Sequence, residues 1–248
     1  LELVARTFLT VNDEAIYSEH AFAVYSLVVQ AVGAKGIEVP ANNYAHDLEQ
    51  FLLAINKNTK VIYIANPNNP TGTLIDKSKL KSFLDNVPKN IIVVLDEAYD
   101  EYLDEDIKSE AFGWISNYKN LLISRSFSKA YGLAGMRLGY GVSSSHLIEV
   151  MNRIRQPFNV NNLAQIAAIA SLDDDDFIFK SKRINNLGMK QITTAFSGLG
   201  IDFIESYGNF IAFKFEDEQA AMMYYQHLLK NGIIVRSIAN YKMPEFLR

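Results

Sequence analysis

Three runs of apolar residues in the first half of the chain have the pattern of buried strands. They are KVIYIANP at 60–67, NIIVVLDEAY at 90–99 and NLLISRSFS at 120–128. Their apolar residues follow one another without polar alternation, which is typical of strands covered on both faces of a parallel sheet. The sequence therefore predicts an α/β fold with a mainly parallel sheet.

Helical patterns separate and follow these runs. Residues 76–87 show helical spacing, with Asp76 placed to cap the start and Pro88 following the end. Further helical stretches are predicted over 143–158 and 161–198. The alternation of strands and helices indicates crossovers that flank the sheet with helices.

The last third of the chain has a different order of elements. Strand patterns at 201–206 and 209–215 precede a helix over 217–232 and a further strand at 233–237. This order predicts a smaller α+β domain over 159–248, after a large domain over 1–158. The acidic run Asp173–Asp176 is predicted to be a solvated turn between helices.

Composition and charge indicate which kinds of ligand the protein could bind. The chain has 248 residues, of which 49% are hydrophobic and 21% charged, and its net charge of −4 gives no support to binding of nucleic acid or an anionic membrane. No cysteine is present, which excludes disulfides, thiolate metal sites and cysteine nucleophiles. The apolar runs are shorter than the roughly 20 residues that span a bilayer. We expect a cytoplasmic protein with small-molecule partners and no metal.

Polar side chains gather where the three predicted strands end. Asn66–Asn69 follow the first run, Asp96 and Tyr99 end the second, and Ser126–Lys129 end the third. Ligands of parallel sheets collect beyond the carboxyl ends of the strands. These groups are therefore predicted to converge on one crevice.

The residue types in this crevice suit a phosphorylated aldehyde. Hydroxyls at Ser126 and Ser128 and the fork of Arg137 suit a phosphate, and Lys129 is placed to form a Schiff base with an aldehyde such as pyridoxal phosphate. The ring nitrogen of that cofactor requires a carboxylate, for which Asp96 is the candidate. Plainer interpretations remain open, since a lysine after a strand is usually a surface residue and NPNNPTG at 66–72 is also typical of a tight turn.

Three motifs carry a resemblance to a known family. NPNNPTG, DEAY and SFSKAYGLAGMRLGY, in this order, resemble the fold-type I pyridoxal-phosphate aminotransferases of classes I and II over essentially the whole chain. Among these, the motifs are most similar to those of histidinol-phosphate aminotransferases. The resemblance implies the large domain of that fold type, with a small α+β domain after it.

The resemblance also assigns roles by matching position. It implies that Lys129 bonds covalently to the cofactor and moves the substrate proton. The other residues implied to contact the cofactor are Asp96 at the ring nitrogen, Tyr99 and Asn69 at the phenolic oxygen, Ser126, Ser128 and Arg137 at the phosphate, and Phe22 stacked on the ring. Those implied to contact substrate are Arg236 and Arg248, at its anionic end, and Asn209.

The implied reaction is transfer of the amino group of L-histidinol phosphate to 2-oxoglutarate, in histidine biosynthesis. An aromatic amino-acid aminotransferase, a threonine-phosphate decarboxylase and a non-catalytic ligand-sensing module stay open as alternatives. The family also has a segment before the helix at Leu1 and a continuation after Arg248. We therefore expect a truncated chain whose parent is an enzyme and a homodimer.

Overall fold

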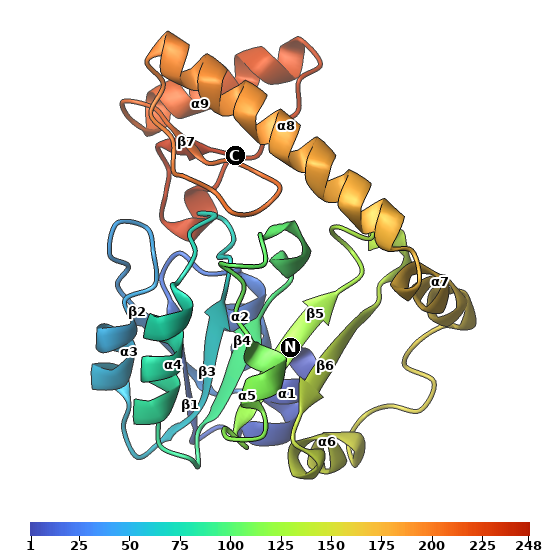
Figure 1. Ribbon diagram of the computed structural model, residues 1–248. Coiled ribbons are helices and arrows are strands. Elements are labelled where there is room, and N and C mark those ends of the chain that lie inside the picture. The colour runs from blue at the N-terminus through green and yellow to red at the C-terminus, as the bar shows by residue number, and fades with distance from the viewer.

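A six-stranded sheet forms the centre of the computed structural model, which describes residues 1–248 (Figure 1). Its order is β2-β1-β3-β4-β5-β6, and every neighbouring pair is parallel except β5 and β6. The strands are β1 (Glu14–Ser18), β2 (Lys35–Val39), β3 (Thr59–Ala65), β4 (Ile92–Asp96), β5 (Leu121–Ser126) and β6 (Gly139–Ser143). The predicted fold class, with its mainly parallel sheet, is confirmed.

Helices cover both faces of this sheet. One face packs against α1 (Glu2–Phe8), α2 (Val24–Ala31) and α6 (Ser145–Asn152). The other packs against α3 (Leu48–Ala54), α4 (Lys77–Asn86) and α5 (Ala111–Trp114). Successive strand residues alternate between the two cores, as Val94 does with Val93 and Leu95. Covering both faces explains why the central strands are continuously apolar.

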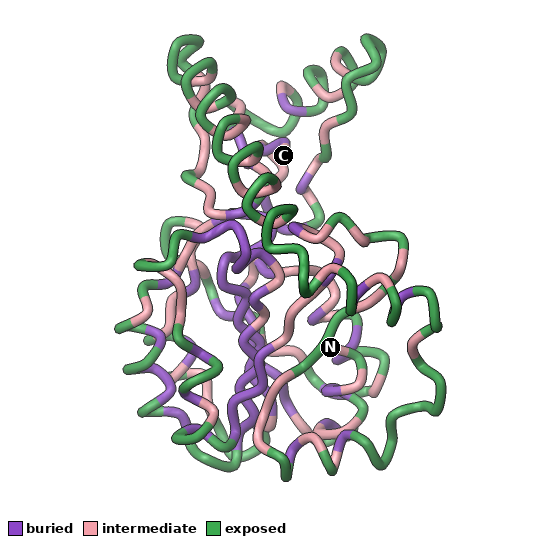
Figure 2. The backbone as a smooth tube through the Cα atoms, turned by 45° about the vertical axis from the view of Figure 1, so that its right-hand side comes forward, coloured by how far each residue is buried: buried purple, intermediate pink, exposed green.

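The remaining elements extend beyond the sheet. They are α7 (Asn162–Leu172), α8 (Asp175–Leu199), α9 (Glu218–Lys230), the short strands β7 (Phe213–Lys214) and β8 (Phe246–Leu247), and the 3-10 turns η1 (Asp100–Tyr102), η2 (Ala134–Met136) and η3 (Ala239–Tyr241). In Figure 1, α8 extends from α7 to the C-terminal elements. Figure 2 shows the buried residues concentrated along the central strands, whereas α8 has no buried residue.

Helix ends follow the capping side chains. Asp76 accepts hydrogen bonds from the backbone of Ser78 and Lys79 and begins α4, as predicted. The predicted tract over 161–198 divides into two helices because Asp174 caps a new one by accepting a hydrogen bond from the Phe177 amide. Asp175 and Asp176 belong to the first turn of α8 rather than to a turn between helices.

The C-terminal strands are shorter than the sequence predicts. Residues 201–206 and 233–237 form no strand, and each meets a neighbour only at one isolated bridge, Phe203 with Phe213 and Ser237 with Leu247. A ladder requires a partner along its whole length, which these segments lack. The helix predicted over 143–158 also ends earlier, at Asn152. The domain division at residues 158 and 159 stays a prediction. None of the helices has the length and apolarity to span a bilayer, α8 included.

Candidate active site

A cleft of about 510 Å³ opens at the carboxyl edge of the sheet. Its walls come from the ends of β4 and β5, the loop after β3, and the first two helices. Every residue that the sequence predicts at a cofactor lines this cleft: Phe22, Asn69, Asp96, Tyr99, Ser126, Ser128, Lys129 and Arg137.

Strand register explains the convergence. Asp96 is the last residue of β4, and it lies opposite Ala65 of β3 on one side and Ser124 of β5 on the other. Because these three strands are parallel, the segments that follow them leave the sheet at the same edge. Residues far apart in the sequence are thereby gathered at one site.

The loop at 66–72 is held by its own asparagines. Asn66 Oδ1 accepts a hydrogen bond from the Ile75 amide at 2.7 Å. Asn68 Nδ2 donates to the carbonyl of His20 and to the hydroxyl of Thr71, both at 2.8 Å. These bonds fix the loop that carries Asn69.

Asn69 connects two other functional groups. Its Nδ2 donates to the Tyr99 hydroxyl at 3.3 Å, and its Oδ1 accepts from Arg248 Nη1 at 2.6 Å. Burial raises the pKa of Tyr99 to about 12, although the charge of Arg248 opposes the shift. Tyr99 therefore stays a neutral hydroxyl that can donate to an oxygen in the cleft.

Lys129 is half-buried beside the Tyr99 ring. Its Nζ lies 5.3 Å from the centroid of that ring. Burial lowers the pKa of Lys129, and the positive charge of Arg248 adds to the shift. A lowered pKa increases the share of neutral amine, which is the form that attacks a carbonyl carbon.

Asp96 also lines the cleft, and it has a partner that the sequence did not reveal. The Tyr25 hydroxyl donates to Asp96 Oδ2 at 2.8 Å. Burial raises the pKa of Asp96, and the bond from Tyr25 opposes this shift. Ser124 Oγ, on the neighbouring strand, is buried without a hydrogen-bond partner. The site thus holds a buried carboxylate that accepts a hydrogen bond from a buried tyrosine, with the Ser124 hydroxyl nearby.

The segment after β5 gathers groups that suit a phosphate. The amide of Ser128 donates to Ser126 Oγ at 3.0 Å, which folds the two hydroxyl residues into one turn. Arg137 follows η2 in the left-handed conformation, with φ of 55°, and its Nη1 donates to the Ala134 carbonyl at 2.7 Å. The guanidinium is exposed at the cleft and retains further donors for an anion.

Arg125, which also borders the cleft, joins β5 to the segment after β4. Arg125 contacts three acidic side chains, with closest N–O distances of 2.7 Å to Glu97, 2.9 Å to Asp100 and 3.2 Å to Glu101. Its Cζ also lies 4.9 Å from the centroid of the Phe112 ring. We call Arg125, Glu97, Asp100 and Glu101 the Arg125 cluster. It braces the two strand ends that carry Asp96 and Ser126.

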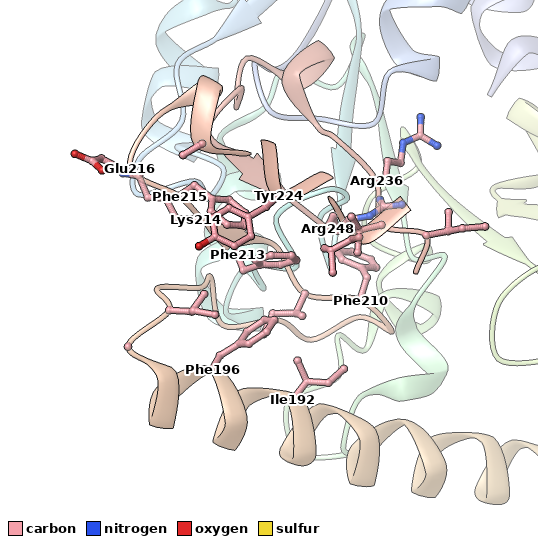
Figure 3. Close-up of a pocket in the computed structure, with 17 residues that line it drawn as sticks. Ile192, Phe196, Phe210, Phe213, Lys214, Phe215, Glu216, Tyr224, Arg236 and Arg248 are labelled. Atoms are coloured by element: carbon pink, nitrogen blue, oxygen red, sulfur yellow. The ribbon is translucent and has the colours of Figure 1, made fainter. Parts of the chain in front are cut away.

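The predicted substrate residues are only partly brought together. Arg236 and Arg248 line a separate, mostly apolar cavity of about 980 Å³, and their backbones pair at 2.9 and 2.8 Å (Figure 3). The guanidinium of Arg248 lies 4.9 Å from the centroid of the Phe210 ring and reaches Asn69, whereas the exposed Arg236 points away from the aromatic lining. Asn209 is exposed and lines neither cavity.

Sequence reasoning missed Tyr25 and Arg125. Tyr25 follows Phe22 by three residues, a spacing that is equally typical of two aromatic residues packing in a core. Arg125 stands between two serines of a strand, so its side chain points away from theirs. The surplus of acidic residues at 96–101 was the available signal for a buried cation.

Comparisons with known proteins agree with the resemblance seen in the motifs. A histidinol-phosphate aminotransferase from Methylobacillus flagellatus is 56% identical over 248 residues, which are 100% of this chain and 66% of that protein. Histidinol-phosphate aminotransferase 2 from Nitrosospira multiformis is 50% identical and is covered over 63% of its length. The chain thus spans about two thirds of the length of these relatives.

A solved structure shows the same fold. The crystal structure of histidinol-phosphate aminotransferase from Sinorhizobium meliloti in complex with pyridoxal-5'-phosphate superposes with a TM-score of 0.91 and 27% sequence identity. The match covers 100% of this chain and 68% of that one. The family model for aminotransferase class I and II matches residues 1–248. The chain therefore belongs to the class I and II aminotransferase family.

Proposed function

We propose that the protein is a pyridoxal-phosphate-dependent aminotransferase of histidine biosynthesis. It would transfer the amino group of L-histidinol phosphate to 2-oxoglutarate, giving imidazole acetol phosphate and L-glutamate. The observation that carries this proposal is one cleft that holds Lys129, Asp96 and the bonded pair of Asn69 and Tyr99. Relatives at 56% and 50% identity with that enzyme name support the choice of substrate.

The cofactor would supply an aldehyde for the amino group and a cationic ring that takes up an electron pair. The neutral amine of Lys129 would be the group that holds the cofactor at its aldehyde. The same nitrogen would accept the proton from the substrate α-carbon. Its lowered pKa suits both tasks because the amine must be unprotonated in each.

Other side chains would orient the cofactor. Asp96 would hold the ring nitrogen protonated, and the hydroxyl of Tyr99 and the amide of Asn69 would donate to the phenolic oxygen. Phe22 would cover one face of the ring. The phosphate would be held by the three groups that the segment after β5 provides: Ser126, Ser128 and Arg137.

The anionic end of the substrate would meet Arg248 first. This arginine is partly buried and reaches Asn69 in the cleft, so it is placed between the cofactor groups and the C-terminal elements. Burial lowers the pKa of Arg248, yet the side chain remains a cation at neutral pH. Arg236 and Asn209 would take part from the exposed rim.

Covalent labelling tests the assignment of Lys129. Pyridoxal phosphate followed by borohydride reduction should add one cofactor mass to the peptide that contains Lys129. Lys129→Ala should abolish the addition, whereas the exposed Lys57→Ala should leave it intact. Equal labelling of wild type and Lys129→Ala at other lysines would overturn the proposal.

Turnover tests the substrate. With 2-oxoglutarate as acceptor, histidinol phosphate should be used with a higher kcat/KM than phenylalanine. A preference for phenylalanine would identify an aromatic amino-acid aminotransferase, and release of carbon dioxide from threonine phosphate would identify a decarboxylase. Binding of the cofactor without any turnover would indicate a ligand-sensing module.

We further propose that the enzyme is a cytoplasmic homodimer, an expectation that rests on the family. Light scattering of the purified protein should give twice the mass of one chain. A mass of one chain across the accessible concentration range would exclude the dimer.

A further inference from the structure

Tyr25 is buried beside Asp96. Its side chain is 0% exposed, and its hydroxyl donates to Asp96 Oδ2 at 2.8 Å. The Tyr25 ring stacks on Tyr63 of β3, with centroids 4.9 Å apart and planes 11° apart. Phe22 meets the same ring edge-on at 6.0 Å. Contacts from two sides hold the ring, so the hydroxyl has one direction in which to point.

The Tyr25 hydroxyl donates its hydrogen bond to a buried carboxylate, whose charge requires stabilisation. Moving a carboxylate out of water is costly unless donors replace the lost hydration. Burial raises the pKa of Asp96, and the strongest opposing contribution is the hydrogen bond from Tyr25. Hydrogen bonds to a charged group are about twice as strong as those between neutral groups. Ser124 and the Ala98 backbone oppose the shift as well, so the Tyr25 hydroxyl is the largest of several contributions that favour the charged carboxylate.

Tyr63, whose ring stacks on that of Tyr25, makes no such hydrogen bond. Tyr63 is also 0% exposed, but its hydroxyl has no hydrogen-bond partner. The two tyrosines share one stack, and only one of them reaches the carboxylate. The other titratable groups near Asp96 are Tyr99 on the segment after β4 and Lys129 after β5.

We propose that Tyr25 is a positioning residue for Asp96: its hydroxyl keeps the carboxylate ionised and turned toward the cleft. This inference rests on the proposed function in one respect, that Asp96 pairs with the ring nitrogen of the cofactor. Its effect on the carboxylate itself is independent of any cofactor. The residue acts through Asp96, although it also borders the cleft.

Titration of the carboxyl group without cofactor tests the first half of the proposal. The protein is labelled with ¹³C at the aspartate carboxyl carbons, and the Asp96 signal is identified by its loss in Asp96→Asn. Tyr25→Phe keeps the ring and removes the donor, and it should raise the titration midpoint of Asp96 by about one pH unit. Tyr63→Phe removes a hydroxyl without a partner and should leave the midpoint unchanged.

Two results would overturn the inference. One is an Asp96 midpoint that is the same in Tyr25→Phe and wild type. The other is an equal shift in Tyr63→Phe, which would show a general effect of the aromatic stack. All four proteins are compared by thermal unfolding, so that a titration is interpreted only for variants that remain folded.

Cofactor binding tests the second half. Tyr25→Phe should bind pyridoxal phosphate about tenfold more weakly than wild type, as followed by cofactor absorbance, and Tyr63→Phe should match wild type. If Tyr25→Phe binds pyridoxal phosphate as tightly as wild type, the hydrogen bond from Tyr25 to Asp96 does not contribute to binding of the cofactor ring. If wild type binds no cofactor, the proposed function fails, while the carboxyl titration still decides whether Tyr25 acts on Asp96.

Discussion

Arg125 and its acidic neighbours show how one buried cation determines the charge of several side chains. A single guanidinium faces Glu97, Asp100 and Glu101, so the Arg125 cluster has a net negative charge when all three are ionised. Glu101 Oε2 is also buried without a hydrogen-bond partner. Burial raises the pKa of Glu97 to about 7, even though Arg125 opposes the shift. The cluster consequently takes up a proton close to neutral pH.

Stability should therefore fall as pH rises through neutrality. The folded-state pKa of Glu97 lies above the ordinary value of 4.5, so its stabilising contribution is complete below about pH 4.5 and is lost as pH rises through about 7. In Glu97→Gln this side chain cannot ionise, so the variant should lose about 2–3 kcal/mol less unfolding free energy than wild type over that pH range. Urea unfolding at a series of pH values measures it.

The control is Glu49→Gln, which changes an exposed glutamate of α3 and should retain the wild-type dependence. If wild type and Glu97→Gln lose stability in parallel between pH 4.5 and 8, Glu97 does not titrate in the folded protein as described.

The sequence predicted the polar residues at the strand ends better than their buried partners. Lys129, Asp96, Tyr99 and Asn69 could be predicted because polar groups at strand ends have few structural reasons to be there. Tyr25 could not, since a tyrosine on an apolar helix packs in a core whether or not its hydroxyl has a partner. Partners such as this one depend on tertiary distances that no local pattern contains.

The loop at 66–72 is an element whose backbone is as important as its side chains. Gly72 adopts φ of +81°, and a Cβ added there would lie 2.2 Å from Ser206 Oγ and 2.8 Å from Ser206 Cα. The Gly72 carbonyl also accepts a hydrogen bond from the Tyr207 amide at 2.8 Å. The loop that presents Asn69 thus contacts the C-terminal part of the chain directly through the Gly72 backbone.

Two glycine substitutions should have opposite effects. Gly72→Ala should destabilise the protein by about 2 kcal/mol or more, because alanine is strained at this φ and its Cβ would clash with backbone. Gly188→Ala lies within α8, where an added Cβ meets nothing within 4 Å, and should stabilise by about 0.5–1 kcal/mol. Thermal unfolding compares the two, and equal effects would contradict the close approach.

Strand prediction succeeded for the three longest apolar runs, and it missed β1, which is fully buried but contains only three apolar residues between Glu14 and Ser18. β3, β4 and β5 are continuously apolar because each contributes to both cores. β2 and β6 are edge strands with exposed residues, and their short sequences with glycine gave no clear apolar run. Residues 201–206 and 233–237 are apolar as predicted, but each pairs with its neighbouring strand, β7 or β8, at one isolated bridge and forms no continuous ladder.

One apolar cluster joins the C-terminal elements to the first part of the chain. It contains Ala212, Ile238, Tyr241, Met243 and Phe246, and Ala23 and Tyr44 from the first part of the chain pack against it. Phe246 is 1% exposed, and its ring meets that of Tyr44 at 5.2 Å. Arg248 follows two residues later, so the position of its guanidinium depends on this packing.

Truncating Phe246, the aromatic side chain in this cluster that contacts Tyr44, should destabilise the protein. Phe246→Ala should lower the free energy of unfolding by about 3–5 kcal/mol, the usual cost of removing a buried phenylalanine side chain. Phe158→Ala is the control, because this side chain is 99% exposed and should contribute almost nothing. Urea unfolding measures both, and a loss below about 1 kcal/mol for Phe246→Ala would show that the cluster does not join the two parts.

The placement of all cleft residues at one edge of the sheet leaves the opposite edge free for attachment. Pro88, Lys89 and Asn90 are exposed just before β4, whose five residues separate them from Asp96 by roughly 16 Å. Because the chain has no cysteine, Asn90→Cys would introduce a single thiol there. A fluorophore or surface tether coupled at that position would report on the protein or immobilise it while the cleft remains open to solution.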